Sequence, residues 1–255
     1  MPTVIASLLA ACLLLFPAPS AAQDLTLDQI LEKNLEALGG EEAVKSIKTL
    51  VINMKMVMGG GVMEAPMTVQ IKRPNKFRTE LTFQGRQIVS AYDGTVAWTI
   101  NPMQGPEPQK LEGRMLTGLA NAADDANTGA LLLMKRGGST VELVGKEDAE
   151  GSPTYKIKVT RKSGDVSTHF LDAEKFLTIK TIMKTPQMGQ EIEVESLPSN
   201  YKKVSGVLMA HSVENRVAGT TRMSMTIEKV EVNQPLEDAI FAWPDKPAEK
   251  PAEKK

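Results

Sequence analysis

The chain has 255 residues, of which 42% are hydrophobic, and its 30 basic residues balance 31 acidic ones. This length and composition suffice for one sizeable hydrophobic core in one or two domains. The even charge balance argues against a nucleic-acid partner, and aromatic residues, at 4%, are too scarce to form stacking platforms for bases or sugars.

The first 22 residues are predicted to be a secretory signal peptide. Residues 2–22 carry no charge, and the apolar run Ala6–Phe16 is followed by small residues that end at Ala22. A cleaved signal peptide predicts that the protein is exported. No later stretch of the sequence is long and apolar enough to span a membrane.

Cys12 is the only cysteine, and Leu9-Ala10-Ala11-Cys12 is similar to a lipoprotein processing box. We disfavour processing there, because it would leave a very short apolar segment before the cleavage point and Leu13–Phe16 at the start of the mature chain. Cleavage after Ala22 removes Cys12, so the exported protein would have neither a disulfide nor a thiolate metal site.

Two helical segments follow the signal peptide. Thr26 and Gln29 fit a capping box, and Gly39-Gly40 ends the first helix. Its apolar stripe consists of Leu27, Ile30, Leu31, Leu35 and Leu38. A short second helical piece is predicted over Glu41–Ser46, and the stripe needs an apolar partner, for which a sheet face is the obvious candidate.

The stretch from Leu50 to Ile71 reads as two strands joined by Gly59-Gly60-Gly61. Apolar residues alternate with mostly polar ones, which predicts a sheet with one apolar and one wet face. The apolar positions are Leu50, Ile52, Met54, Met56, Met58, Met63, Ala65, Met67, Val69 and Ile71. Methionine is unusual in strands, and its flexible thioether suits surfaces that accept variable apolar partners. An ordinary methionine-rich core is the alternative interpretation.

The next strands are predicted over Phe77–Phe83, Gln87–Tyr92 and Thr95–Asn101. Asp93-Gly94 is a strong hairpin signal, and a two-residue loop would pair Val89 with Trp98. A three-residue loop at 84–86 would place Leu81 opposite Val89 and keep one apolar face, whereas a two-residue loop at 85–86 would reverse it. That register stays open in the sequence.

Residues 113–136 are predicted to be a helical insert, after which short strands return with turns at Gly151-Ser152-Pro153 and Pro198-Ser199-Asn200. Ten to twelve strands with few helices predict a mainly β fold: a half-open antiparallel barrel whose concave apolar face is covered by the first helix and the insert. We expect residues 23–244 to form a single domain, and residues 245–255, rich in Lys, Pro, Ala and Glu, to be a disordered tail.

Catalytic and metal-binding patterns are missing from the sequence. His169 and His211, the only histidines, have no motif-spaced Asp, Glu or Ser partner. There is no His/Cys cluster for a metal, no Gly-rich loop entering a helix and no Gly-x-Ser-x-Gly elbow. We therefore predict a protein that is not an enzyme and that uses neither a metal nor a cofactor.

Several segments, in order along the chain, resemble the LolA/LolB-like outer-membrane lipoprotein-sorting superfamily. Together they cover nearly all of residues 24–244, and they are Ala37–Gly40, Arg73–Arg78, Ala91–Gly94, Trp98–Pro102, Val141–Glu147 and Val232–Leu236 through Phe241. The resemblance implies a half-open antiparallel barrel with a helix-covered apolar face, which agrees with the pattern.

The resemblance implies a periplasmic carrier that binds the acyl chains of lipoproteins or other lipids and moves them towards the outer membrane. Such a monomeric carrier would receive its cargo from an inner-membrane exporter and pass it to an outer-membrane acceptor. The predicted acyl groove consists of Leu31, Leu35, Leu50, Ile52, Met54, Met56, Met58, Met63, Met67, Val69 and Trp98. Carriers of this family also use an arginine in an early strand to close the cover; no position here aligns with it, and Lys55 and Arg73 remain the open choices.

Two other interpretations remain. The same half-barrel could be a sensor or regulatory module that binds the periplasmic segment of a membrane protein. We would expect such a sensor to carry a second domain, for which residues 246–255 are far too short. The protein could also be a β-scaffold whose hollow is filled by its own side chains.

Overall fold

The computed structural model describes residues 24–187 and 190–244, so the predicted signal peptide and C-terminal tail lie outside the described residues. One antiparallel sheet of 13 strands forms the body of the molecule, in the order β6-β5-β4-β3-β2-β1-β13-β12-β11-β10-β9-β8-β7. The first six strands are β1 (Thr49–Met58), β2 (Met63–Lys72), β3 (Lys76–Phe83), β4 (Arg86–Tyr92), β5 (Ala97–Ile100) and β6 (Gln109–Leu111). The others are β7 (Thr140–Ala149), β8 (Ser152–Thr160), β9 (Val166–Asp172), β10 (Thr178–Gln187), β11 (Gln190–Val204), β12 (Val207–Val217) and β13 (Thr220–Val232).

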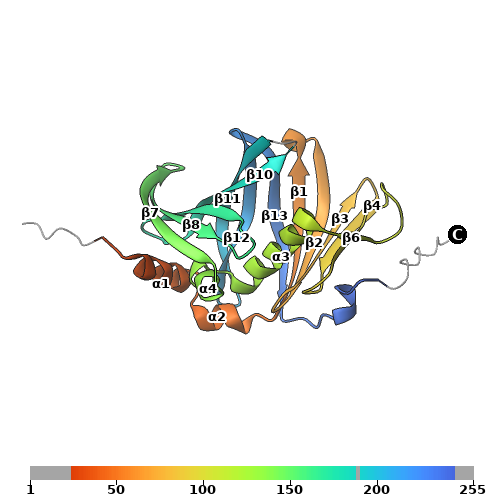
Figure 1. The fold of residues 1–255 in the computed structure, drawn as a ribbon, viewed down its shortest axis with the longest axis horizontal. Helices are drawn as coiled ribbons and strands as arrows, with labels where there is room; N and C mark the ends of the chain where they lie inside the picture. Colours follow the sequence, from red (N-terminus) through yellow and green to blue (C-terminus); the bar gives the residue numbers. More distant parts are fainter. Residues whose placement is uncertain (1–23, 188–189, 245–255) are drawn as a thin grey trace, which may run out of the picture.

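The sheet is open, because β6 and β7 are its edges and do not pair with each other. In Figure 1 the strands curve across the back of the molecule and the helices run along the hollow side. The predicted fold, a half-open antiparallel barrel covered by an N-terminal helix and a mid-chain helical insert, is confirmed. The strand count is one above the predicted range, because no strand was predicted between Asn101 and the insert, where β6 lies.

Helix α1 (Leu27–Ala37) begins with the predicted capping box, in which the Thr26 hydroxyl accepts from the Gln29 amide and the Gln29 side chain accepts from the Thr26 amide. Its stripe packs on the β7–β9 end of the sheet, where Ile30 and Leu31 join Ile157, Val159 and Leu171 with no exposed surface. This cluster is a filled hydrophobic core. Helix α2 (Glu41–Ser46) follows as predicted.

The joint between α1 and α2 lies against the β11–β12 turn. The Leu208 amide donates to the Leu38 carbonyl at 2.8 Å. Gly39 has a φ of +117°, and a Cβ atom on it would lie 2.2 Å from the Gly206 carbonyl oxygen. Only glycine fits this close approach of two backbones.

The insert contains two helices, α3 (Gly113–Thr128) and α4 (Leu131–Arg136), separated by Gly129 in a left-handed conformation. Helix α4 buries Leu131, Leu132 and Met134 beside α1. Helix α3 crosses the hollow side and contacts β3, β4 and β5 (Figure 1). In the described residues no helix is long and apolar enough to cross a membrane.

The inner face of the sheet follows the predicted alternation along β1 and β2. Leu50 is opposite Ile71, Ile52 is opposite Val69 and Met58 is opposite Met63, without a break in register. The face that carries these residues packs against Ile47 and Ala126 and is therefore the concave one.

The structure settles the register at one hairpin that the sequence left open, and it differs from the prediction at the next hairpin. Gln84 and Gly85, both at positive φ, form a two-residue turn that pairs Leu81 with Ile88. At the next hairpin Tyr92 pairs with Ala97 instead of Thr95, because the Asp93 carboxylate accepts from the amides of residues 95 and 96 and closes a four-residue loop. As a result, Val89, Ala91 and Trp98 lie on the outer face.

The predicted turn at 198–200 is wrong. Strand β11 continues through Pro198, which pairs with Val213, and Asn200 accommodates the path with a φ of +52°. The chain instead turns at Ser205 and Gly206, both at positive φ, as a two-residue hairpin requires.

Candidate functional site

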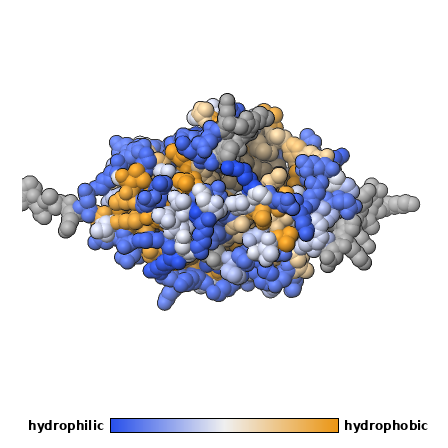
Figure 2. Space-filling model, viewed as in Figure 1, coloured by the Kyte–Doolittle hydropathy of each residue, from blue (hydrophilic) through white to orange (hydrophobic). Residues whose placement is uncertain are grey.

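Three rows of side chains cover the concave face near the β1–β2 tip. Each row runs across β2, β1 and β13, and the rows are Met63–Met58–Met223, Ala65–Met56–Met225 and Met67–Met54–Ile227. Seven of these nine positions are methionine, and we call these seven the methionine patch. Among them only Met56 is fully buried. Figure 2 shows a hollow with hydrophobic walls where Figure 1 draws the upper end of β1.

The same strands change composition below Met54. The next two rows are Val69–Ile52–Val230 and Ile71–Leu50–Val232, which contain no methionine and pack with Ile47 into a hydrophobic cluster. Met54 and Met67 pack against this cluster. The methionine patch therefore extends a packed apolar surface outward along the concave face.

A cavity of about 370 Å³ lies between this cluster and the helices. Its apolar lining comes from α1, α2, the insert and strands β1, β2 and β12, and consists chiefly of Leu38, Val44, Ile47, Leu50, Ile52, Ile71, Ala126, Leu131, Met134, Val207, Leu208 and Met209. This volume is at the small end of the roughly 300–1,000 Å³ that is typical of small-molecule pockets.

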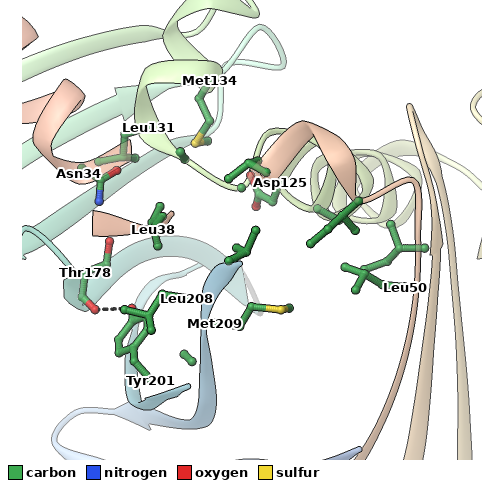
Figure 3. A pocket seen from close by; sticks show the side chains of 18 of the residues that line it. Asn34, Leu38, Leu50, Asp125, Leu131, Met134, Thr178, Tyr201, Leu208 and Met209 are labelled. Carbon is green, nitrogen blue, oxygen red and sulfur yellow. Dashed lines mark hydrogen bonds between the residues drawn. The ribbon is translucent and has the colours of Figure 1, made fainter. Parts of the chain in front are cut away.

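The cavity has an apolar end and a polar end. In Figure 3 Leu50 lies on one side, while Asn34, Thr178 and Tyr201 lie on the other. Tyr201 donates its hydroxyl to the Thr178 carbonyl at 2.7 Å, and burial raises the pKa of Tyr201 to about 12. Asn34 donates to the Phe176 carbonyl at 2.7 Å, and its Oδ1 is buried without a protein partner.

His169 also lines the polar end. Its ring nitrogens contact the hydroxyls of Ser167 at 2.9 Å and Thr181 at 3.3 Å. Burial, reinforced by the nearby Arg161 guanidinium, lowers the pKa of His169 to about 4. The ring is therefore neutral at physiological pH and adds no charge to the cavity wall.

Two arginines from opposite parts of the sheet hold the C-terminal end of α3. Arg73, just after β2, donates to the carbonyls of Val44 at 2.6 Å and Ala126 at 3.2 Å. Arg161, just after β8, forms an ion pair with Asp125 at 2.5 Å. Burial lowers the pKa of Arg73, because desolvation disfavours its charged form. Both arginines line the cavity, and they fasten α3 where its last turn, at Asp125 and Ala126, forms part of the cavity wall.

The predicted groove residues fall into three places. Leu50 and Ile52 line the cavity. Val69 packs in the cluster beneath it, and the five predicted methionines, Met54, Met56, Met58, Met63 and Met67, lie on the concave face beyond it. Their role in ligand binding remains a prediction.

The placement of Trp98, Leu31 and Leu35 in the groove was wrong. Trp98 lies on the outer face, where its Nε1 donates to the Phe241 carbonyl at 2.9 Å. The cause is the two-residue turn at Gln84–Gly85, which pairs Leu81 with Ile88 and not with Val89. This shift of one residue turns Val89, and with it Trp98 on the next strand, to the outer face. Leu31 and Leu35 belong to the filled core at the β7–β9 end and do not line the cavity.

Sequence reasoning missed several residues of the site. Met223 and Met225 lie opposite Met58 and Met56, and their Met-x-Met alternation was a usable signal. The polar end of the cavity gave no local signal, because its residues come from four separate elements, α1, β9, β10 and β11. Among the described residues no group of three His, Cys, Asp or Glu side chains could hold a metal ion.

No family model matches the sequence, and no curated protein matches it. Solved structures do match the fold. A LolA superfamily protein from Nitrosomonas europaea has a TM-score of 0.57 at 14% identity, covering 86% of this chain and 98% of its own. A putative outer membrane lipoprotein-sorting protein domain from Vibrio parahaemolyticus has a TM-score of 0.57 at 12% identity, with 83% and 95% covered.

The chain has the LolA-like fold. A DUF1329 family protein from Desulfovibrio piger shares it, with a TM-score of 0.56 at 12% identity, covering 85% of this chain and 97% of its own. Identities this low establish the LolA-like fold alone, so a functional argument has to start from the cavity, the methionine patch and helix α3 of this chain.

Proposed function

We propose that this protein is a periplasmic carrier that binds the acyl chains of lipoproteins or other lipids and moves them towards the outer membrane. One observation carries the proposal: Leu50 and Ile52, which line the apolar cavity, belong to the cluster against which Met54 and Met67 of the methionine patch pack. The lipoprotein-sorting domain that shares the LolA-like fold supports the same class of cargo.

An acyl chain needs an apolar environment, because each methylene group gains about 0.8 kcal/mol on leaving water. The cavity volume of about 370 Å³ suits a single chain better than several. A cargo with two or three chains would therefore extend over the methionine patch. Methionine side chains suit this contact, because their three rotatable bonds let one surface adapt to chains of different length.

A carrier also has to release its cargo, and α3 provides a cover that can move. In its described part only Ala123 is fully buried, whereas α1 buries four residues. Few buried apolar contacts give a segment low local stability. The contacts from Arg73 and Arg161 then hold α3 over the cavity, and Arg73 takes the place of the lid-closing arginine that the family resemblance implies. Transfer from an inner-membrane exporter to an outer-membrane acceptor would require these contacts to break.

The proposal is tested by placing a charge on the concave face. Met54 is half-buried, lies next to the Ile52 that lines the cavity, and is opposite Met67. We expect Met54→Asp to abolish uptake of a fluorescent acyl probe. A bound acyl chain would strip water from the aspartate carboxylate, and that desolvation is costly. Probe fluorescence titrated against the purified mature protein measures the effect.

The matched control is Val57→Asp, which places the same charge on the other face of the same strand, opposite Glu64. It should retain probe uptake. Thermal unfolding of both variants checks that each of them is folded. If a folded Met54→Asp variant takes up the probe as well as the unmodified protein, the concave face is not the acyl site and the proposal fails. Native mass spectrometry of protein isolated from its own periplasm should show a co-purifying acyl species.

A further inference from the structure

The methionine patch contains many sulfur atoms, although an apolar surface can be built from aliphatic side chains alone. Strands β2, β1 and β13 use Val, Ile and Leu in the two rows near the cavity and methionine at seven of nine positions in the three outer rows. Seven of the chain's 14 methionines are collected there. Because the inner rows show that branched residues fit this face, the change to thioethers indicates a role for the sulfur atoms themselves.

Thioether sulfur is a soft, neutral ligand, and soft ligands select Cu(I) over the harder divalent metals. The outermost row brings three thioethers together from three adjacent strands. Met58 lies in the middle strand, directly opposite Met63 on one side and Met223 on the other. Directly opposite residues in antiparallel strands have Cβ atoms roughly 4.5–5.5 Å apart. Three flexible side chains at that spacing can turn their sulfur atoms towards one ion above Met58.

We infer that Met58, Met63 and Met223 form a binding site for a soft monovalent cation, Cu(I) in the cell. The outermost row suits a cation better than the row below, because all three of its methionines are half-buried whereas Met56 is fully buried. An ion bound by neutral ligands keeps its charge, and partial access to water lowers the cost of holding that charge. Met56 and Met225 lie directly behind and can supply a fourth sulfur.

The site has a distinctive property. Cysteine and histidine must lose a proton before they bind a metal, so their affinity depends on pH. A thioether carries no such proton. Cation binding at the methionine patch is therefore expected to have the same affinity at pH 5.5 and pH 7.5. The inference does not depend on acyl binding, because sulfur coordination and apolar contact are separate properties of the same side chains.

The experiment uses Ag(I) nitrate in chloride-free buffer as a redox-inert probe, with isothermal titration calorimetry for affinity and native mass spectrometry for stoichiometry. The mature, unmodified protein should bind one Ag(I) ion tightly. The triple variant Met58→Leu, Met63→Leu and Met223→Leu keeps the apolar character of the patch, because leucine and methionine are similar in volume. Its Ag(I) affinity should fall by at least about 100-fold, the upper end of the roughly 10–100-fold cost of losing an outer-shell partner.

The control variant is Met103→Leu with Met115→Leu, which replaces two exposed methionines outside the patch. It should bind Ag(I) as the unmodified protein does. The inference is overturned if the unmodified protein binds no Ag(I) at micromolar concentration, if the triple variant keeps its affinity, or if the affinity falls steeply towards low pH. Acyl-probe uptake by the unmodified protein separates the two proposals. Uptake, together with Ag(I) binding that the triple variant loses, supports the carrier and the sulfur site together. Ag(I) binding without any acyl-probe uptake refutes the carrier alone.

Discussion

The two ends of the sheet are covered by helices in different ways. At the β7–β9 end α1 and α4 press apolar side chains against the strands, and Leu31, Ile157 and Leu171 retain no exposed surface. Around β1, β2 and β13 the concave face is only partly covered, and the C-terminal end of α3 is held beside it by the polar contacts of Arg73 and Arg161. One sheet thus supports a filled core and a hollow, and the packing of its helices decides which of the two forms.

The comparison bears on the carrier proposal, which needs a stable fold with a cover that moves. The α1 end contributes the buried apolar area from which most of the stability of a domain comes. The carrier proposal requires the α3 end to give up contacts while this core stays intact. Each of the following predictions tests whether the two ends differ in this way, from the largest expected effect to the smallest.

Truncation of a buried leucine should separate the two ends most clearly. Leu31→Ala removes a side chain with no exposed surface and should lower the free energy of unfolding by about 2–5 kcal/mol. The matched change Met58→Ala, at a half-buried position in the outermost row of the methionine patch, should lower the free energy of unfolding by less than about 1 kcal/mol. Urea unfolding followed by circular dichroism measures both. Equal losses would mean that the two ends are packed alike, which contradicts the comparison.

Acid should weaken the region where the two ends meet. His169 has a folded-state pKa of about 4, below the roughly 6.5 of an unfolded chain, so the unfolded state binds more protons between these values. Its contribution to stability is complete above pH 6.5 and is lost as the pH falls towards 4. The loss between pH 7 and pH 4.5 should be about 2–3 kcal/mol smaller in His169→Gln than in the unmodified protein. Urea unfolding at the two pH values measures this difference, and an identical pH dependence would show that His169 is not buried as a neutral ring.

Removal of an arginine should loosen α3 and leave α1 unchanged. In Arg73→Gln the hydrogen bonds to the Val44 and Ala126 carbonyls are lost, which should cost about 1–2 kcal/mol of local stability. Amide hydrogens of α3 should then exchange about tenfold faster. Hydrogen exchange with mass spectrometry resolves the two helices. Arg78→Gln is the control, because Arg78 bonds to the Ile240 carbonyl on the outer face; if it loosens α3 equally, the effect is not local.

Local patterns in the sequence were sufficient to predict most elements of the fold. The Thr26–Gln29 capping box, the glycine stop after α1 and the alternation along β1 and β2 each depend on residues close in sequence. Turn length was harder to predict, because both two-residue and three-residue loops suited the chemistry of the 84–86 segment. That single choice decided on which face Trp98 would lie.

The candidate site was predictable only in part. The methionines of β1 and β2 stand out in the sequence, but Met223 and Met225 join them only through the pairing of β1 with β13. The cavity depends on how far the helices stand from the sheet, which no local pattern encodes. Arg73 and Arg161 reach α3 from strands that are distant in sequence, so their shared role became visible only in three dimensions.

The contact between Gly39 and Gly206 has a consequence for how the protein can move. Two backbones that touch without side chains leave no clearance for rotation, so the end of α1 is fixed against the β11–β12 turn. Any hinge must therefore lie elsewhere along the chain, and Gly129, between α3 and α4, is free of such a constraint. The cover movement that the carrier proposal requires would therefore bend the chain at Gly129 and leave α1 in place on the sheet.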